Sequence, residues 1–434
     1  WRIAQRKWLD RTLCVGVLFF GLASGSQLHA MPSEPTTRGE RSGGMGVQEL
    51  LAIVRTTHPA VATRQADVEA ADSSLLGAKL RFLPAPSFDR TELSGNAAST
   101  VRLEQPLWTG GRLTGGLDSA EAKAKLSNAT LSEVQLNLSL RTVTLYQQFV
   151  SQSGRLEVID DGLKRLDGLK QLIEHRSEAG ASAAQDVELA RSRMAQLQSE
   201  RSAILAQRQS VLAQLSHLLG RRLSVKDLNP QPVQPSAMDL SGVDNRALAN
   251  SPALMKSKVN VDSAKADEKL AQSVLWPSVA FRAEYQNGRY DGSLQPGNRW
   301  YLVVNYVPGA GLSSIAEVSA TRAKIRAAES EVETTHREVL DRLQTETDDY
   351  ESARLRIPDL TLSTRLSKGQ IESNQRLFVL GRRSWLDLLN SVRELVNVHQ
   401  QEIEARAVLY GSYFRLGLIA GDLFPNPTIY SEGK

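Results

Sequence analysis

The residues that could do chemistry form few candidate sites, and the clearest of these is incomplete. Glu333 and His336 are three residues apart, the spacing that places a carboxylate and an imidazole on one helix face at a di-iron site. Such a site needs a second pair of this kind and further glutamates from facing helices, and the other histidines do not supply them. The sequence also contains no phosphate-binding loop, dinucleotide fingerprint, zinc-protease helix or nucleophile elbow. We therefore expect no enzyme activity, no catalytic residue, no cofactor and no resident metal.

Charged and apolar side chains alternate in two pairs of short segments. A period of two is typical of β-strands with one apolar and one polar face. The charged positions are Arg102, Glu104, Arg282 and Glu284. Aromatic residues on the apolar face or at the strand ends are Phe281, Tyr285, Trp108, Trp276 and Trp300. Either these strands form an ordinary sheet covered by helices, or they cross a membrane with charges toward a lumen and aromatic residues at the lipid interface.

An internal duplication places these strands in a larger unit. The segment 251–254 repeats the pattern of 58–61, and Phe281 follows Phe88 at the same separation. Further along the chain, Asp387 follows Gly381 at the distance at which Asp186 follows Gly180. We predict two copies of one unit, each made of a helix, two strands, a long helix and a further helix. The first repeat would span 47–220 and the second 244–421, with a linker at 221–243 and a C-terminal tail at 422–434.

The long helices are predicted by a seven-residue period. In the first repeat this period is carried by Leu131, Leu138, Leu145, Ile159, Leu166 and Ile173, with Gln152 as the polar exception. A strict seven-residue period keeps one seam facing a partner helix and imposes a left-handed supercoil. Residues 113–177 contain no proline, and a helix of that length would span roughly 100 Å. A compact single-layer domain does not need helices this long.

The N-terminal segment has the features of an export signal. Basic residues precede an apolar stretch at 13–23, and small residues follow up to Ala30. We predict a signal peptide at 1–30, since the apolar stretch is too short for a membrane-spanning helix, and a flexible linker at 31–46. The alternative is an N-terminal membrane anchor. Without this segment the chain is nearly neutral, so no nucleic-acid partner is expected. Cys14 is the single cysteine, so the rest of the chain has no disulfide.

The edges of the predicted sheet separate the two interpretations of the strands. Four strands leave two open edges, and open sheet edges do not occur in the lipid core of a membrane. Bacterial single-chain barrels have at least about eight strands. If these strands cross a membrane, other copies of the chain must complete the barrel.

Two motifs give the chain a resemblance to the TolC family of outer-membrane efflux and secretion channels. Residues 105–112, Gln-Pro-Leu-Trp-Thr-Gly-Gly-Arg, resemble the family's strand-to-helix turn. Residues 381–390, Gly-Arg-Arg-Ser-Trp-Leu-Asp-Leu-Leu-Asn, resemble its helix–helix turn at the periplasmic end. The resemblance covers 47–423 and departs from the pattern at 307–311, a shortened turn.

The resemblance implies an α+β membrane protein with an internal two-fold repeat. Four transmembrane strands per chain would complete a trimeric twelve-stranded β-barrel above a long α-helical coiled-coil barrel. The implied location is the outer membrane, with contact to its lipid and a large periplasmic portion. The implied partners are two further copies of the chain, a periplasmic adaptor (membrane fusion) protein and an inner-membrane transporter.

The resemblance also implies a periplasmic gate. Asp387 falls on the first acidic position of the family motif, and Asn390 falls on the second. Arg383 and Asp186 fall on positions that pair between neighbouring helix pairs, and Phe378 replaces an aromatic hydroxyl. A ring of three carboxylates would attract cations. Two plainer interpretations stay open: Asp387 stabilises the start of its helix, and Arg383 belongs to a solvated turn.

The resulting expectation is a passive conduit in a tripartite export system. Type I protein secretion is the main expectation, because no lipid-attachment cysteine is found near the predicted mature start. The alternative within the same class is efflux of small molecules such as drugs or metals. A soluble periplasmic coiled-coil adaptor and a helical-bundle metalloenzyme are rivals from other classes.

Overall fold

The computed structural model describes residues 44–93, 96–231, 237–289, 295–307 and 313–423, all within one compact unit, Gly43–Lys434. The predicted signal peptide at 1–30, nearly all of the predicted linker at 31–46 and nearly all of the predicted tail at 422–434 lie outside these residues.

The described helices and strands repeat in order, and the longer helices also repeat in length. The first copy consists of α1 (Val47–Thr57), α2 (Pro59–Leu80), β1 (Ala85–Leu93), β2 (Asn96–Trp108), α3 (Arg112–Glu178) and α4 (Ala184–Leu219). The second consists of α5 (Val243–Asn250), α6 (Pro252–Ser273), β3 (Ser278–Gly288), β4 (Gly297–Asn305), α7 (Ser313–Val379) and α8 (Trp385–Ala420). Both α3 and α7 have 67 residues, and both α4 and α8 have 36. A short 3-10 helix, η1 (Val225–Asp227), lies between the copies.

Equivalent residues begin and end equivalent helices. Pro59 and Pro252 occupy the first turns of α2 and α6, where a missing backbone N–H leaves no helix hydrogen bond unmade. The residue before each proline caps its helix, through the Nδ1 of His58 and the Oγ of Ser251. Gly180 and Gly381 have positive φ angles in the turns that follow α3 and α7. The duplication is therefore encoded in caps and turns as well as in the strands.

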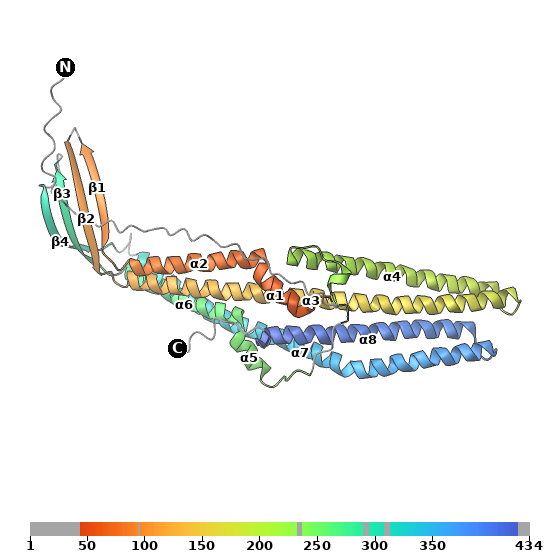
Figure 1. Cartoon of the computed structure of the whole chain (residues 1–434). Coiled ribbons are helices and arrows are strands. Elements are labelled where there is room, and N and C mark those ends of the chain that lie inside the picture. The colour runs from red at the N-terminus through yellow and green to blue at the C-terminus, as the bar shows by residue number, and fades with distance from the viewer. Residues whose placement is uncertain (1–43, 94–95, 232–236, 290–294, 308–312, 424–434) are drawn as a thin grey trace, which may run out of the picture. The chain divides into compact units, whose positions relative to one another are not determined.

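Long helices run side by side in two hairpins, α3 with α4 and α7 with α8 (Figure 1). Three hydrophobic clusters fill the space between them. One cluster surrounds Tyr146 and Leu416, a small one lies around Ile159, and the third lies near the hairpin turns around Ile173 and Leu388. The seven-residue period correctly predicts this core, since four of the six seam residues of the first repeat are buried: Leu145, Ile159, Leu166 and Ile173.

Four antiparallel strands lie side by side in one sheet in the order β1-β2-β3-β4 (Figure 1). Two hairpins, β1–β2 and β3–β4, meet where β2 pairs with β3. This arrangement confirms the predicted fold class of long helices combined with four strands in a two-fold repeat. No helix among the described residues has the length and hydropathy needed to cross a bilayer.

Several details differ from the sequence-based expectations. Met45 falls in the predicted flexible linker but pairs with the segment after η1, since its N–H donates to the carbonyl of Asp227 and its carbonyl accepts from the N–H of Asn229. The fourth strand begins at Gly297, so Trp300 lies inside it rather than at its end. In addition, α7 carries Pro358 in its interior, where α3 has no proline.

Candidate functional site

The charged residues of the strands form interlocked pairs on one face of the sheet. In the register of β2 and β3, Arg102 lies opposite Glu284, and Glu104 lies opposite Arg282. The Nε of Arg102 is 2.6 Å from Oε1 of Glu284, and the Nη2 of Arg282 is 2.6 Å from Oε2 of Glu104. Such charge-assisted bonds between facing strands fix their register as well as adding stability.

This charged face is electrically balanced. Arg299 of β4 lies 3.8 Å from Glu284, and Asp89 of β1 lies 3.6 Å from Arg102. The described strands therefore place three arginines and three carboxylates on this face: Arg102, Arg282, Arg299, Asp89, Glu104 and Glu284. Glu284 is only 8% exposed, because arginines lie on both sides of it.

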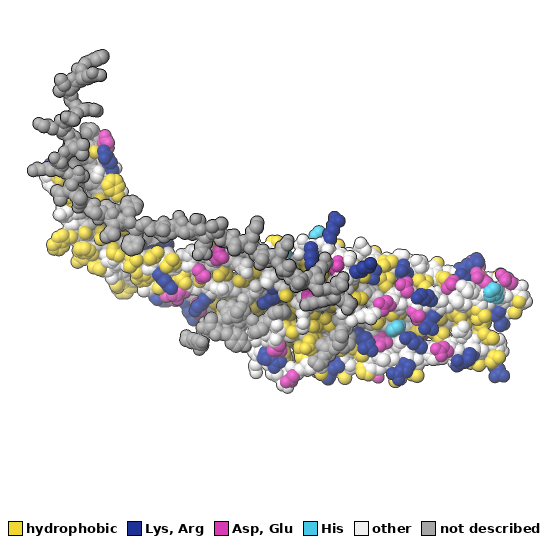
Figure 2. Space-filling view, in the orientation of Figure 1, with side chains coloured by type: hydrophobic (Ala, Val, Ile, Leu, Met, Phe, Trp, Pro, Cys, Tyr) yellow, Lys and Arg dark blue, Asp and Glu magenta, His cyan; other side chains and the backbone are white. Residues whose placement is uncertain are grey.

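The opposite face of the sheet is apolar and exposed. The register brings together Phe88, Val101, Leu103, Phe281, Tyr285, Trp300, Leu302 and Val304. All of these side chains are exposed, and Trp300 is 78% exposed. Figure 2 shows hydrophobic side chains gathered on the sheet and where it joins the helices. An apolar face of this size needs a partner of its own, such as lipid or another protein.

The other two predicted girdle residues lie at the helical end of the strands. Trp108 ends β2, and Trp276 lies two residues before the start of β3. Their rings pack edge to face with centroids 6.2 Å apart. Both are exposed and both have an indole N–H, which is the combination that membrane interfaces favour.

Four of the predicted gate residues, Phe378, Arg383, Asp387 and Asn390, lie at or near the hairpin turn between α7 and α8, and Asp186 lies in the first turn of α4. Asp387 lies in the first turn of α8, where its backbone N–H donates to Oγ of Ser384 at 3.1 Å. Its carboxylate lies 3.7 Å from Nη1 of Arg383, so the described ion pair of Arg383 is within its own turn. Asn390 is exposed one turn further along α8.

Asp186 contacts α8 through its backbone rather than through its carboxylate. Its carbonyl accepts a hydrogen bond of 3.2 Å from Nε1 of Trp385. Trp385 is buried and packs against Phe378, with ring centroids 5.7 Å apart. The guanidinium of Arg176 lies over the Phe378 ring, 5.0 Å from its centroid. Phe378 is thus a buried packing residue that joins the two hairpins, which accounts for an aromatic side chain without a hydroxyl at this position.

Sequence reasoning missed a buried polar layer farther from the turns. Glu402 of α8 is 7% exposed and accepts hydrogen bonds from Thr361 at 2.9 Å and from Arg406 at 2.8 Å. Burial would raise the pKa of Glu402, but these hydrogen bonds more than offset that effect and lower it. The equivalent positions in the first repeat hold Asp160 and Arg201, which form an ion pair of 2.6 Å. Comparing the repeats position by position would have found this layer.

A second buried ion pair was also missed. Arg415 of α8 contacts Glu346 of α7 at 2.6 Å, and both side chains are largely buried. The same guanidinium donates to the side-chain oxygen of Gln147 on α3. The side chains of Gln147, Glu346 and Arg415 therefore connect α3, α7 and α8 inside the hydrophobic cluster around Tyr146.

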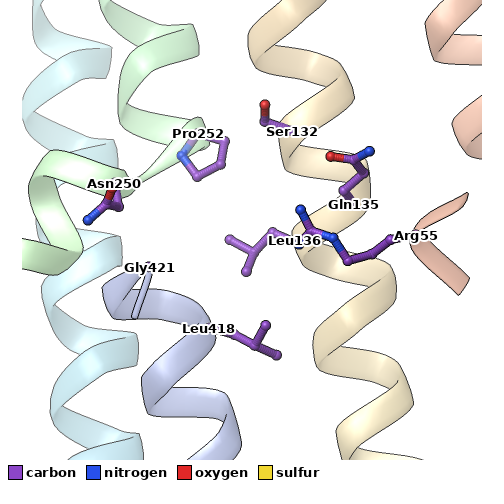
Figure 3. A pocket seen from close by; sticks show the side chains of 8 residues that line it. All are labelled: Arg55, Ser132, Gln135, Leu136, Asn250, Pro252, Leu418 and Gly421. Atoms are coloured by element: carbon purple, nitrogen blue, oxygen red, sulfur yellow. The ribbon is translucent and has the colours of Figure 1, made fainter. Parts of the chain in front are cut away.

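A small pocket lies where the ends of several helices meet (Figure 3). Its lining residues are Arg55, Ser132, Gln135, Leu136, Asn250, Pro252, Leu418 and Gly421. The amide nitrogen of Asn250 donates to the carbonyl of Ala420 at 2.8 Å, which ties the end of α8 to the end of α5. Burial lowers the pKa of Arg55. These groups join helix ends, and we assign no ligand to the pocket.

Glu333 and His336 both lie on α7. Glu333 forms a surface ion pair with Arg337 at 2.8 Å. No group of three or more potential metal-ligating side chains occurs in the part of the chain that the structure describes.

Comparison with known proteins decides the family. Residues 50–221 and 243–422 match the family described as outer membrane efflux protein, so both repeats are covered. The chain belongs to this family. Because this is a family of outer-membrane channels, the protein is classed as a channel and not as an enzyme. The rivals from other classes, the soluble adaptor and the metalloenzyme, are set aside on the same ground.

Solved structures of outer-membrane proteins share the fold of this family member. VceC of Vibrio cholerae aligns with a TM-score of 0.74 at 15% identity, over 86% of this chain and 96% of that chain. CmeC of Campylobacter jejuni aligns with a TM-score of 0.74 at 14% identity, over 88% and 86% of the two chains. The TolC-type fold expected from the sequence motifs is confirmed.

A curated relative carries an export function in its name. The pyoverdine export outer membrane protein OpmQ of Pseudomonas putida is 25% identical over 270 residues, which is 61% of this chain. The match spans 54% of that relative's own length. Pyoverdine is the cargo that this relative's name gives, and the cargo of the present family member is a separate question.

Proposed function

We propose that the protein is the outer-membrane channel of a tripartite pump that exports small molecules, and that three copies form the channel. A periplasmic adaptor protein and an inner-membrane transporter would complete the pump and supply the energy. This proposal takes the alternative expected from the sequence, small-molecule efflux, in place of type I protein secretion.

The observation that carries the proposal is the two-faced sheet with open edges. Its apolar face is exposed, its other face holds paired charges, and β1 and β4 each have one edge without a strand partner in the described sheet. Lipid on one side and a water-filled lumen on the other satisfy both faces. Neighbouring copies satisfy the edges, because a membrane strand must have both edges paired.

The relative's name supports the choice of cargo. A pyoverdine exporter moves a small molecule, whereas no similarity described above points to a secreted polypeptide. On this proposal Arg102, Glu104, Arg282 and Glu284 line the lumen. The residues Phe281, Tyr285, Trp108, Trp276 and Trp300 would face lipid or its interface. Asp387 would form a ring of three carboxylates at the periplasmic mouth, with Asn390, Arg383, Asp186 and Phe378 nearby.

Two measurements test the proposal. Mass determination of the detergent-solubilised protein should give three chains, and a membrane-inserted monomer would overturn the assembly. Deletion of the gene should raise the intracellular level or toxicity of small molecules without changing the set of secreted proteins. Loss of a secreted polypeptide with unchanged small-molecule export would instead identify a protein-secretion channel.

A further inference from the structure

The sheet contains a template for the junction that it needs with another copy. Each repeat contributes one hairpin, and the two hairpins meet where β2 pairs with β3. In a closed barrel, β4 of one copy would meet β1 of the next copy. That junction would have the same strand order as the one between β2 and β3, because the second strand of one hairpin would again lie beside the first strand of another.

The two hairpins are equivalent residue by residue. Phe88 pairs with Val101 in the first hairpin, and Phe281 pairs with Leu302 in the second. At the other end of the strands, Ala85 pairs with Glu104, and Ser278 pairs with Asn305. Both comparisons place β1 on β3 and β2 on β4 with the same offsets. Each residue that is paired within the first hairpin therefore has a paired counterpart in the second.

Applying the register between β2 and β3 to the counterpart residues gives a register for the junction between β4 and β1 of the next copy. Within the chain, Gln105 lies opposite Phe281 and Glu104 lies opposite Arg282. We propose that β4, extended by the following Tyr306, pairs with β1 of a neighbouring copy in the equivalent register, with Tyr306 opposite Phe88 and Asn305 opposite Asp89. The inference rests on the trimeric channel proposed above and adds the residues at which its subunits join.

The side chains of the two edges fit this register. Tyr306 is 55% exposed and Phe88 is 67% exposed, and their pairing would place two aromatic rings side by side on the apolar face. Asp89 and Asn305 would meet on the charged face, where the amide can donate to the carboxylate. A shift of one residue would turn every side chain of the strand to the wrong face. A shift of two residues would place Tyr306 opposite Pro86 or Arg90 and lose the aromatic pair.

Cysteine cross-linking tests the register in the intact protein. Facing Cα atoms in an antiparallel pair lie about 4.5–5.5 Å apart, within the ~4.4–6.8 Å that a disulfide spans. The double variant Asp89→Cys/Asn305→Cys should give covalent trimers on mild oxidation, visible in non-reducing denaturing gels. The matched controls Asp89→Cys/Val303→Cys and Asp89→Cys/Val307→Cys place the second thiol on the same face, but at diagonal positions about 7–8 Å away. These should cross-link at least tenfold less.

A second pair and an independent mass measurement keep the outcomes distinct. Phe88→Cys/Tyr306→Cys probes the same register on the apolar face, in case the first pair disturbs folding. Single-cysteine variants report background from Cys14. Preferential cross-linking of a control pair, or no cross-linking of either proposed pair in a protein of trimeric mass, would overturn the register alone. A monomeric mass would overturn the proposed channel itself.

Discussion

The indole of Trp385 in α8 donates a hydrogen bond to the backbone carbonyl of Asp186 in α4, at 3.2 Å. This bond links the two helical hairpins of one chain at their turns. The acceptor is a main-chain carbonyl, so the bond does not depend on the charge of the Asp186 side chain. The rings of Trp385 and Phe378 pack at a tilt, and Arg176 lies over the Phe378 ring, which adds apolar and cation–π contact at the same place.

Removing the indole donor should loosen the turns without emptying the core. In Trp385→Phe the ring still packs on Phe378, but the carbonyl of Asp186 loses a partner. We expect a loss of about 1 kcal/mol in unfolding free energy and faster proteolysis at the turns. Trp385→Ala should cost about 3–5 kcal/mol, because it also leaves a cavity. Equal stability of Trp385→Phe and wild type would show that the hydrogen bond has no stabilising role.

The proposed carboxylate ring predicts block of the channel by cations. Asp387→Asn should weaken block by multivalent cations in planar-bilayer recordings without changing the trimeric mass, because three charges are removed from one constriction. Asn390→Ala is a matched control that changes the adjacent exposed position without removing charge. Unchanged block in Asp387→Asn would place the cation site elsewhere.

Arg383 should matter less than the family motif suggests. Its described partner is Asp387 in the same turn, and both side chains are about half exposed. Exposed ion pairs of this kind contribute at most roughly 0.5 kcal/mol. We therefore expect Arg383→Ser to leave resting conductance nearly unchanged. A large rise in conductance would instead support an ion pair between Arg383 and Asp186 of a neighbouring helix pair in the assembled trimer.

Charge balance on the proposed lumen face predicts weak ion selectivity of the proposed barrel. Glu284→Gln removes one carboxylate that lies between Arg102 and Arg299, so the face gains a net positive charge in each copy. Reversal potentials in a salt gradient should shift toward anion selectivity. Arg282→Gln should shift them toward cations by freeing Glu104, and the opposite shifts of the two variants serve as mutual controls. No shift in either variant would show that these strands do not line the conducting path.

His399 should make the helical region less stable in mild acid. Burial lowers the pKa of His399 below its usual 6.5, and the nearby Lys368 acts in the same direction. The unfolded chain then binds a proton more readily than the folded one, so stability falls as pH drops below about 6.5. The melting temperature should decrease between pH 7.5 and 5.5, and this decrease should be smaller in His399→Gln. An identical pH dependence in the variant would remove His399 as its cause.

The sequence predicts the repeat and its long helices because these depend on local and periodic signals. Gly180 and Gly381 end equivalent helices, and the seam through Leu145 and Ile173 is buried as expected. The alternation of Arg282 and Glu284 with Phe281 and Tyr285 likewise corresponds to the two faces of β3. Such patterns depend only on the periodicity of a single helix or strand and not on its neighbours.

Contacts between elements are what the sequence does not predict. The motif around Asp387 implies an ion pair between Arg383 and Asp186 of neighbouring helix pairs, which stays a prediction, and no motif indicates the described bond from Trp385 to the carbonyl of Asp186. A side chain near a turn has several partners within reach, and packing of the neighbouring hairpin selects one. Glu402 was missed for a related reason, since its buried partners Thr361 and Arg406 are assembled by the pairing of α7 with α8.

The break in the hydrophobic core of the second hairpin has a consequence for how amide protons exchange with solvent. Pro358 removes one backbone donor from α7, and the polar layer at Glu402 separates the cluster around Leu416 from the cluster around Leu388. Segments with separate apolar cores open with separate free energies. Amides of α7 and α8 between this layer and the hairpin turn should therefore exchange as one cooperative group, earlier than those packed around Tyr146. In the first hairpin, where the equivalent helix has no proline, protection should decline gradually toward Gly180.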